Sequence, residues 1–150
     1  MAEERQLVVF SLLEENYGID IYKVQEIIQY REITYVPKAP PFVKGVINLR
    51  GKIIPVIDLK ERFGLAEKEI NTDTRIIVVE IASQTVGLIV DSVTEVLRIS
   101  TSNIEPPPPV TTIEADFIEG VGKLDERLII ILDIDRILSR EERGELVNIA

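Results

Sequence analysis

The sequence contains no cysteine, no histidine and no tryptophan among its 150 residues. Without cysteine or histidine, the chain can form no disulfide, no thiolate nucleophile and no Cys/His zinc site. It can likewise form no Ser-His-Asp triad and carry no phosphohistidine. These absences remove several reaction classes before any motif is considered.

Basic residues are also in short supply, with 17 against 26 acidic ones and a formal net charge of −9. An acidic surface repels nucleic acid, and the eight aromatic residues (four Phe and four Tyr) offer few platforms for stacking bases. Binding of nucleic acid, which some small β-barrels perform, is therefore a weaker alternative for the function of this chain. With 45% hydrophobic and 29% charged residues, the composition is typical of a soluble globular protein.

Long hydrophobic runs are missing as well. The longest apolar stretches span residues 7–10, 53–57 and 128–132, whereas a helix that spans a bilayer needs about 20 residues. The first six residues lack the basic and apolar character of a signal peptide. We expect a cytoplasmic protein with no direct membrane insertion, which reaches a membrane only through a partner.

The two halves of the chain resemble each other in sequence. Residues 7–12 align with residues 76–81 at an offset of 76 − 7 = 69, and later residues align at an offset of 120 − 45 = 75. The order of strand-like runs, glycines and acids is shared, which indicates an internal duplication. The aligned pairs are Gly18 with Gly87, Val24 with Val93 and Glu26 with Glu95 at the first offset, and Gly45 with Gly120 and Asp58 with Asp133 at the second.

Each copy is predicted to form a β-unit of four or five short strands closed by a helical turn. Within one domain of residues 1–150, the first barrel is expected over about residues 7–64 and the second over about 74–139, followed by a tail at 140–150. Barrels this small would each have a thin core, so we expect them to share one. The predicted fold is mainly β, with two packed Src-homology-3-like barrels and short helices.

Two segments show helical spacing. Asp20 is a capping residue, and Ile21, Val24 and Ile28 follow it at positions i, i+3 and i+7. Either this face belongs to the core, or part of it lines a groove for a partner helix. Asp133 is likewise predicted to begin a longer helix, with an apolar face made by Ile134, Ile137 and Leu138.

No arrangement of acidic residues supports catalysis. The carboxylates at 133 and 135 lie at a predicted helix start, where capping explains them, and the pairs at 14–15 and 141–142 lie on solvated surface. Segment 45–52 lacks the spacing and the Ser or Thr of a phosphate-binding loop. We therefore expect no enzyme activity, no cofactor and no metal, and regard a carboxylate enzyme as the remaining alternative.

The predicted hairpin over residues 46–57 has Arg50 and Gly51 at its tip, where Gly51 supplies the positive φ that a tight turn requires. Arg50 aligns with Asp125 of the second copy, so the two tips present different charges to solvent. Arg50 is therefore either an ordinary solvated residue or a partner contact. The four prolines at 106–109 are predicted to form a stiff, extended connection rather than a ligand for aromatic-grooved domains.

Longer motifs give the chain a family resemblance. Residues 17–27 (YGIDIYKVQEI) and 42–59 (FVKGVINLRGKIIPVIDL) resemble the two signatures of the CheW family of bacterial chemotaxis coupling proteins. Residues 86–97 (VGLIVDSVTEVL) and 120–122 match the family too, so the resemblance covers about residues 6–140. It implies two packed five-stranded barrels and a function without catalysis.

The family resemblance also implies partners. CheW-like proteins couple transmembrane chemoreceptors, the methyl-accepting chemotaxis proteins, to the histidine kinase CheA and help to assemble receptor arrays. The expected partners are therefore the cytoplasmic tip of a chemoreceptor and the regulatory domain of CheA, at the inner face of the membrane. That kinase domain has the same fold, and the start at Met1 favours the free adaptor.

Carried over position by position, the resemblance implies four receptor-binding residues: Val24, Glu26, Gly45 and Arg50. We expect Val24 to contribute to a groove floor between the barrels and Gly45 to permit close approach. Glu26 and Arg50 should make charge-assisted contacts at the rim.

Two further positions, Gly87 and Val96, match family positions linked to coupling. Which partner they serve is left open, and both positions are equally compatible with a place in the core. For the kinase we expect an apolar barrel end, in the second half of the chain.

Overall fold

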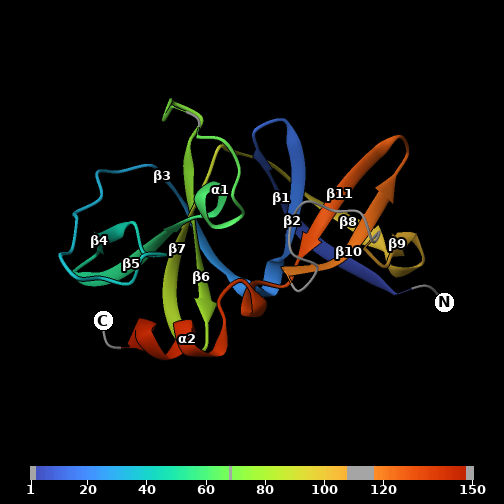
Figure 1. Ribbon diagram of the computed structural model, residues 1–150. Helices are drawn as coiled ribbons and strands as arrows, with labels where there is room; N and C mark the ends of the chain where they lie inside the picture. The colour runs from blue at the N-terminus through green and yellow to red at the C-terminus, as the bar shows by residue number, and fades with distance from the viewer. Residues whose placement is uncertain (1–2, 68, 108–116, 148–150) are drawn as a thin grey trace.

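The computed structural model describes residues 3–67, 69–107 and 117–147, and it shows a mainly β protein with a few short helices (Figure 1). The first seven elements are β1 (Glu4–Leu12), β2 (Glu15–Asp20), the 3-10 turn η1 (Ile21–Lys23), β3 (Val24–Gln29), β4 (Gly45–Leu49), β5 (Lys52–Asp58) and α1 (Leu59–Arg62). The elements that follow are β6 (Arg75–Ile81), β7 (Gln84–Val90), β8 (Ser92–Ser100), η2 (Thr101–Asn103), β9 (Ile104–Glu105), β10 (Ile118–Leu124), β11 (Arg127–Leu132), η4 (Ile134–Arg136) and α2 (Arg140–Val147).

The strands form two mixed sheets, each curled around its own apolar cluster. One sheet has the strand order β3-β6-β7-β5-β4 and comes from the middle of the chain, and we call it the central barrel. The other, with the order β8-β1-β2-β11-β10-β9, combines strands from both ends of the chain, and we call it the terminal barrel. The expected two-barrel β fold is confirmed, with the two-residue β9 as a sixth strand of the terminal barrel.

The internal repeat is visible in the order of the elements. β1 and β2 correspond to β6 and β7, β3 corresponds to β8, and β4 and β5 correspond to β10 and β11. The strand pairs repeat as well: β1 pairs antiparallel with β2 as β6 does with β7, and β5 pairs parallel with β7 as β11 does with β2. The second half thus folds with the same local geometry as the first.

The barrels do not coincide with the two halves of the repeat, so the expected division into barrels at 7–64 and 74–139 is wrong. β3 of the first half pairs with β6 of the second, and β8 of the second half pairs with β1 of the first. Each half therefore contributes its first hairpin to one barrel and its other strands to the other barrel. The exchange is possible because equivalent hairpins have equivalent apolar faces and fit either partner.

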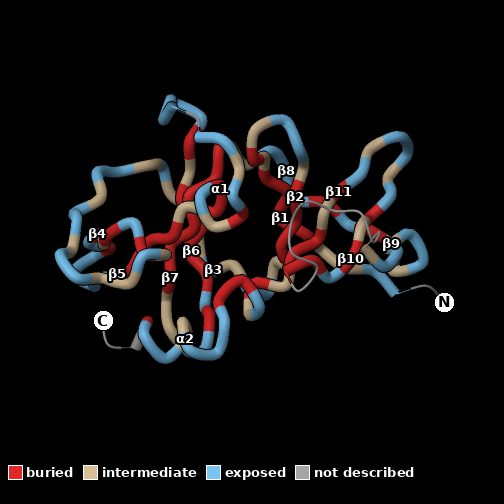
Figure 2. The backbone as a smooth tube through the Cα atoms, viewed as in Figure 1, coloured by how far each residue is buried: buried red, intermediate tan, exposed pale blue. Residues whose placement is uncertain are grey.

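Three apolar clusters make up the core, and the largest lies between the barrels. Figure 2 shows the buried segments of β1, β2, β6 and β7. One small cluster fills each barrel, whereas the outward faces of β1, β2, β6 and β7 meet in the large one. We call this shared core the seam. It contains stacked rings, since Tyr17 lies between Phe10 and Phe63 with centroid distances of 5.9 and 6.2 Å. The expected shared core is therefore present.

Two predicted helical segments begin at the expected capping residues, Asp20 and Asp133, but are shorter than predicted. Only Ile21–Lys23 forms a helical turn after Asp20, and β3 follows with exposure alternating residue by residue. The β-branched run of β3 adds to the free edge of β6, which decides in favour of a strand. After Asp133, the 3-10 turn η4 ends before a separate helix, α2 (Arg140–Val147). The proline prediction falls partly outside the described residues, which omit 108–116.

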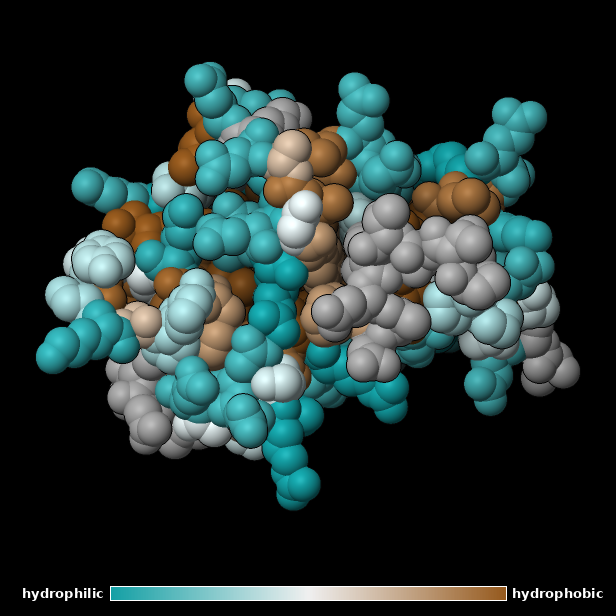
Figure 3. All heavy atoms as spheres, in the orientation of Figure 1, coloured by the Kyte–Doolittle hydropathy of each residue, from teal (hydrophilic) through white to brown (hydrophobic). Residues whose placement is uncertain are grey.

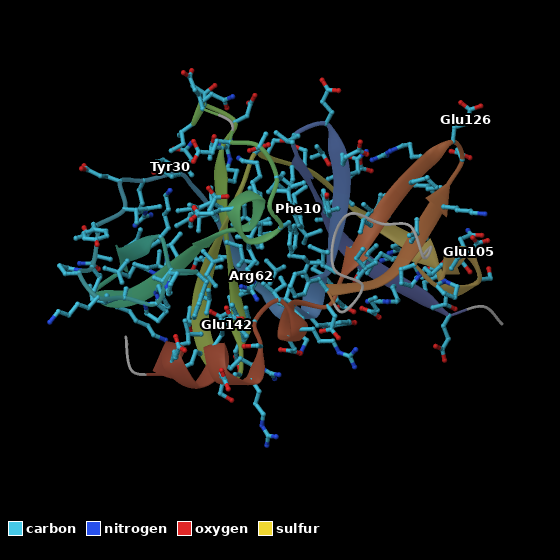
Figure 4. The ribbon with its side chains drawn as sticks, in the orientation of Figure 1. Phe10, Tyr30, Arg62, Glu105, Glu126 and Glu142 are labelled. Carbon is cyan, nitrogen blue, oxygen red and sulfur yellow. The ribbon has the colours of Figure 1, made fainter. Side chains whose placement is uncertain are left out.

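The C-terminal helix α2 is fixed to the rest of the molecule by Arg62 (Figure 4). The Arg62 guanidinium forms a two-pronged ion pair with Glu142, at 2.7 and 2.8 Å, and lies 5.4 Å from the centre of the Phe117 ring. Burial opposes ionisation of Glu142, but the Ser139 N–H and Arg62 outweigh it and hold the pKa of that carboxyl below its usual range. The helix is thus tied to α1 by charge, and its Leu146 is buried in the large apolar cluster between the barrels.

Candidate docking site

The candidate site is built on the tip of the β4–β5 hairpin. Arg50 and Gly51 both have positive φ, at 51° and 84°, as a tight two-residue turn requires. The Asn48 side chain accepts a hydrogen bond from the Gly51 N–H at 2.8 Å and holds the turn closed. The predicted role of Gly51 is confirmed, and the turn points the side chain of Arg50 into solvent with 71% of it exposed.

Arg50 forms an ion pair with Glu26, which reaches it from β3. The Arg50 Nη1 donates to Glu26 Oε1 at 3.1 Å, and Nη2 bonds the second carboxylate oxygen. The hydrogen bond from Arg50 holds the pKa of the Glu26 carboxyl below its ordinary value, and the same bond raises the pKa of Arg50. Both groups therefore remain charged near neutral pH while they stay open to solvent.

Arg31 completes this corner of the central barrel, and no motif in the sequence indicated its role. Its Nη1 donates to the Asn48 carbonyl at 3.0 Å, where β3 and β4 form no strand pair with each other. Its charge also helps to lower the pKa of Glu26. We call Glu26, Arg31, Asn48 and Arg50 the tip cluster.

Val24 lies at the start of β3, between the tip cluster and the seam. It is half-buried and packs against the edge of the seam core. The register of β3 against β6 shifts between Val24 and Glu26, which marks a bulge at this point. The structure thus pairs Glu26 with Arg50, and it places Val24 two residues before Glu26 on the same strand, against the seam.

The two glycines of the expected site are buried. A Cβ on Gly45 would lie 2.4 Å from the Thr34 carbonyl oxygen, and one on Gly87 would lie 2.8 Å from Ile76 Cγ2. Gly45 does permit a close approach, but the segment that approaches is the chain itself. The packing of the barrel therefore accounts for both residues, and any contact with a partner at these positions stays a prediction.

Val96 lies on β8 of the terminal barrel, with 52% of it exposed. It is therefore a surface residue, not a core one. Val96 lies on a different barrel from Arg50 and Gly87. The residues that the family resemblance singles out therefore do not form a single site.

The terminal barrel has an ion pair equivalent to the one at the tip cluster. Glu95 is the counterpart of Glu26 at an offset of 95 − 26 = 69. Its carboxylate pairs with Arg127, at 3.2 Å, beside the β10–β11 turn. Arg127 lies two residues after Asp125, which is the aligned counterpart of Arg50. Alignment of single positions therefore indicated opposite charges at the two tips.

Exposed apolar side chains repeat in the same way. Ile27 and Val96 are related by 96 − 27 = 69 and are 39% and 52% exposed. Ile53 and Leu128 are related by 128 − 53 = 75 and are 49% and 58% exposed. Figure 3 shows apolar patches among hydrophilic side chains on the face in view. Each barrel thus combines an ion pair with solvent-exposed apolar residues.

Other kinds of site receive no support from the described part of the chain. No helix in residues 3–67, 69–107 and 117–147 is long and apolar enough to cross a membrane. Over the same residues, no three acidic side chains lie close enough together to hold a metal ion.

These features define a class: a two-barrel β protein with solvent-exposed ion pairs and apolar residues on both barrels. The model of the CheW-like domain matches residues 6–142. "Chemotaxis protein CheW" of Klebsiella aerogenes is 40% identical over 97% of this chain and 89% of its own length, and that of Treponema pallidum is 36% identical over 98% and 89%. The crystal structure of the scaffolding protein TtCheW from Thermoanaerobacter tengcongensis is 51% identical, with a TM-score of 0.85 over 93% of this chain and 90% of that one.

The chain therefore belongs to the CheW family of chemotaxis proteins. The predicted family resemblance is confirmed, and it extends over nearly the whole chain. The likeness to a scaffolding protein agrees with a function based on binding.

Proposed function

We propose that this protein is a non-catalytic adaptor of bacterial chemotaxis, which couples transmembrane chemoreceptors to the histidine kinase CheA and helps to assemble receptor arrays. In this proposal it works in the cytoplasm, at the inner face of the membrane, and is held there by its receptors. The observation that carries the proposal is the ion pair between Arg50, exposed at the β4–β5 hairpin tip, and Glu26 of β3, in a chain of the CheW family.

The receptor side of the proposal rests on the tip cluster and Val24. A receptor tip made of helices would place its apolar face on Val24 and its polar edge on Glu26 and Arg50. Because Arg50 is exposed to solvent and Glu26 is partly exposed, these charges set the register of docking more than its affinity. Gly45 supports this surface from within by letting β4 pack against the Thr34 segment.

The kinase side rests on the terminal barrel. Val96 is exposed there beside the Glu95–Arg127 pair, and Gly87 lies within the central barrel. The regulatory domain of CheA has the same kind of fold, so we propose that it docks on an apolar end of the terminal barrel. Docking contacts of signalling proteins are often small and individually weak, and they gain strength from the array.

The proposal is tested by capture on an immobilised receptor tip. Arg50→Ala should reduce capture while binding of the kinase regulatory domain remains. The chain supplies a matched control in Arg127→Ala, which removes the equivalent ion pair from the other barrel and should leave receptor capture unchanged. Equal loss of receptor binding in both variants, with folding intact, would contradict the assignment.

A charge-swapped variant separates contact from support. Glu26→Arg combined with Arg50→Glu keeps an ion pair within the protein but reverses the charges that a partner meets. If the receptor contacts Arg50 directly, the swap should reduce capture at least as much as Arg50→Ala does. Restored capture would show that the pair only supports the fold. Recovery of nucleic acid instead of receptor and kinase from a lysate would overturn the adaptor proposal.

A further inference from the structure

Two charged residues are hidden where the barrels meet. Among the described residues, Lys60 and Asp91 are the buried charges, each only 5% exposed. The Lys60 Nζ bonds Asp91 Oδ1 directly. The proposed docking surfaces use neither residue, although burying a charge is costly unless a partner compensates it.

Asp91 connects the two barrels through one carboxylate. Lys60 belongs to α1, which follows β5 and packs on β7 of the central barrel. The second oxygen of Asp91 accepts a hydrogen bond from the Leu13 N–H, at 2.5 Å, in the β1–β2 turn of the terminal barrel. Asp91 also donates its own N–H to the Ser11 carbonyl at 3.0 Å. The residue lies where the chain leaves β7 for β8, so all three bonds meet at a crossing between barrels.

The internal repeat provides a comparison site at the other crossing, between β2 and β3. The counterpart of Lys60 is Asp135, since 135 − 60 = 75, and it pairs with Lys23 at 3.0 Å. The charges are reversed relative to the Asp91 side, and both side chains are nearly half exposed, at 48% and 41%. Water competes for this exposed pair, which therefore holds its elements together less firmly than the buried pair does.

We propose that Asp91, through Lys60, is a positioning residue that fixes the orientation of the terminal barrel relative to the central barrel. This inference rests on the proposed function, in which the Arg50 surface meets the receptor and the Val96 surface meets the kinase. Those surfaces lie on different barrels, so a two-partner complex depends on the angle between them. The Lys23–Asp135 side of the seam does not set that angle.

The test uses the double variant Lys60→Met with Asp91→Asn. The pair is replaced by neutral groups of similar size, so no unpaired charge is left in the core. Asparagine can still accept the Leu13 N–H bond, and only the ion pair with Lys60 is lost. The matched control is Lys23→Met with Asp135→Asn, which severs the exposed pair on the opposite side.

The absence of native cysteine allows spin labels to be placed at one exposed site per barrel, through Gln29→Cys and Arg98→Cys. Pulsed electron resonance should give a broader distance distribution in the Lys60/Asp91 variant than in the parent, and an unchanged one in the control. Because each docking surface is remote from the change, binding of receptor tip alone and kinase domain alone should stay within about twofold of the parent. Receptor control of the kinase in the three-component mixture should be lost.

An unchanged distance distribution in the Lys60/Asp91 variant would overturn the proposal, and so would retained receptor control of the kinase. A parent protein that binds neither partner would overturn the proposed function instead, while the spin-label measurement would still decide whether Asp91 sets the barrel orientation.

Discussion

Gly45 offers a sharp test of how this fold supports its surface. An alanine Cβ there would lie 2.4 Å from the Thr34 carbonyl oxygen and 2.5 Å from Ile33 Cγ2, far inside normal contact. The oxygen cannot retreat freely, because Thr34 and Val46 exchange two backbone hydrogen bonds of 2.9 Å. Overpacking of this kind should lower the free energy of unfolding of Gly45→Ala by about 1–3 kcal/mol.

The same substitution elsewhere in the chain provides the controls, and chemical denaturation measures all three. Gly120 is the aligned counterpart, with a Cβ position 2.8 Å from the Glu105 carbonyl oxygen, so Gly120→Ala should also destabilise. Gly144 lies within α2 with nothing near its Cβ position, and Gly144→Ala should stabilise the protein by about 0.5–1 kcal/mol.

A Gly45→Ala protein as stable as the parent would refute the packing argument. If that protein also failed to capture the receptor, Gly45 would be a direct contact instead. We expect receptor capture per folded molecule to be retained.

Three other outcomes are expected. Ser139 and Arg62 hold the pKa of Glu142 below its unfolded value despite its burial, so the pair stabilises the fold above the unfolded pKa and loses this effect as pH falls through the folded pKa. Denaturation at several pH values should show that the free energy of unfolding falls less steeply in acid for Glu142→Gln than for the parent. An equal slope in the two proteins would count against the pair. Phe63→Ala should lower the free energy of unfolding by about 3–5 kcal/mol by opening the seam, and a thermal melt close to that of the parent would exclude it. Val96→Asp should change stability by less than about 0.5 kcal/mol but weaken kinase binding in titration calorimetry; a large loss of stability would place Val96 in the core.

The strands, the hairpin tip and the repeat could be predicted from sequence because local patterns decide them. The positive φ of Gly51 could be predicted from the tight turn at the hairpin tip. Glu26 and Glu95 align as repeat partners from the sequence alone, before their ion pairs are known. Which hairpin joins which barrel could not be predicted, because β1–β2 and β6–β7 present the same pattern to either partner.

The errors in the site have equally physical causes. Apolar residues at 21, 24 and 28 fit a helix, yet the free edge of β6 recruits residues 24–29 as a strand. Arg31 is far from Asn48 in sequence, and only the opening between β3 and β4 brings its guanidinium to that carbonyl. The Lys60–Asp91 pair likewise depends on the exchange of hairpins between barrels.

Recruitment of the kinase to receptor-containing vesicles tests the adaptor function most directly. Vesicles carrying a chemoreceptor are sedimented with the kinase in the presence of the parent protein, Arg50→Ala or Arg127→Ala. We predict that the parent and Arg127→Ala carry the kinase into the pellet, whereas Arg50→Ala leaves both itself and the kinase in solution. Equal recovery of the kinase with Arg50→Ala, or in the absence of this protein, would contradict the proposal that Arg50 and Glu26 link the receptor to the kinase.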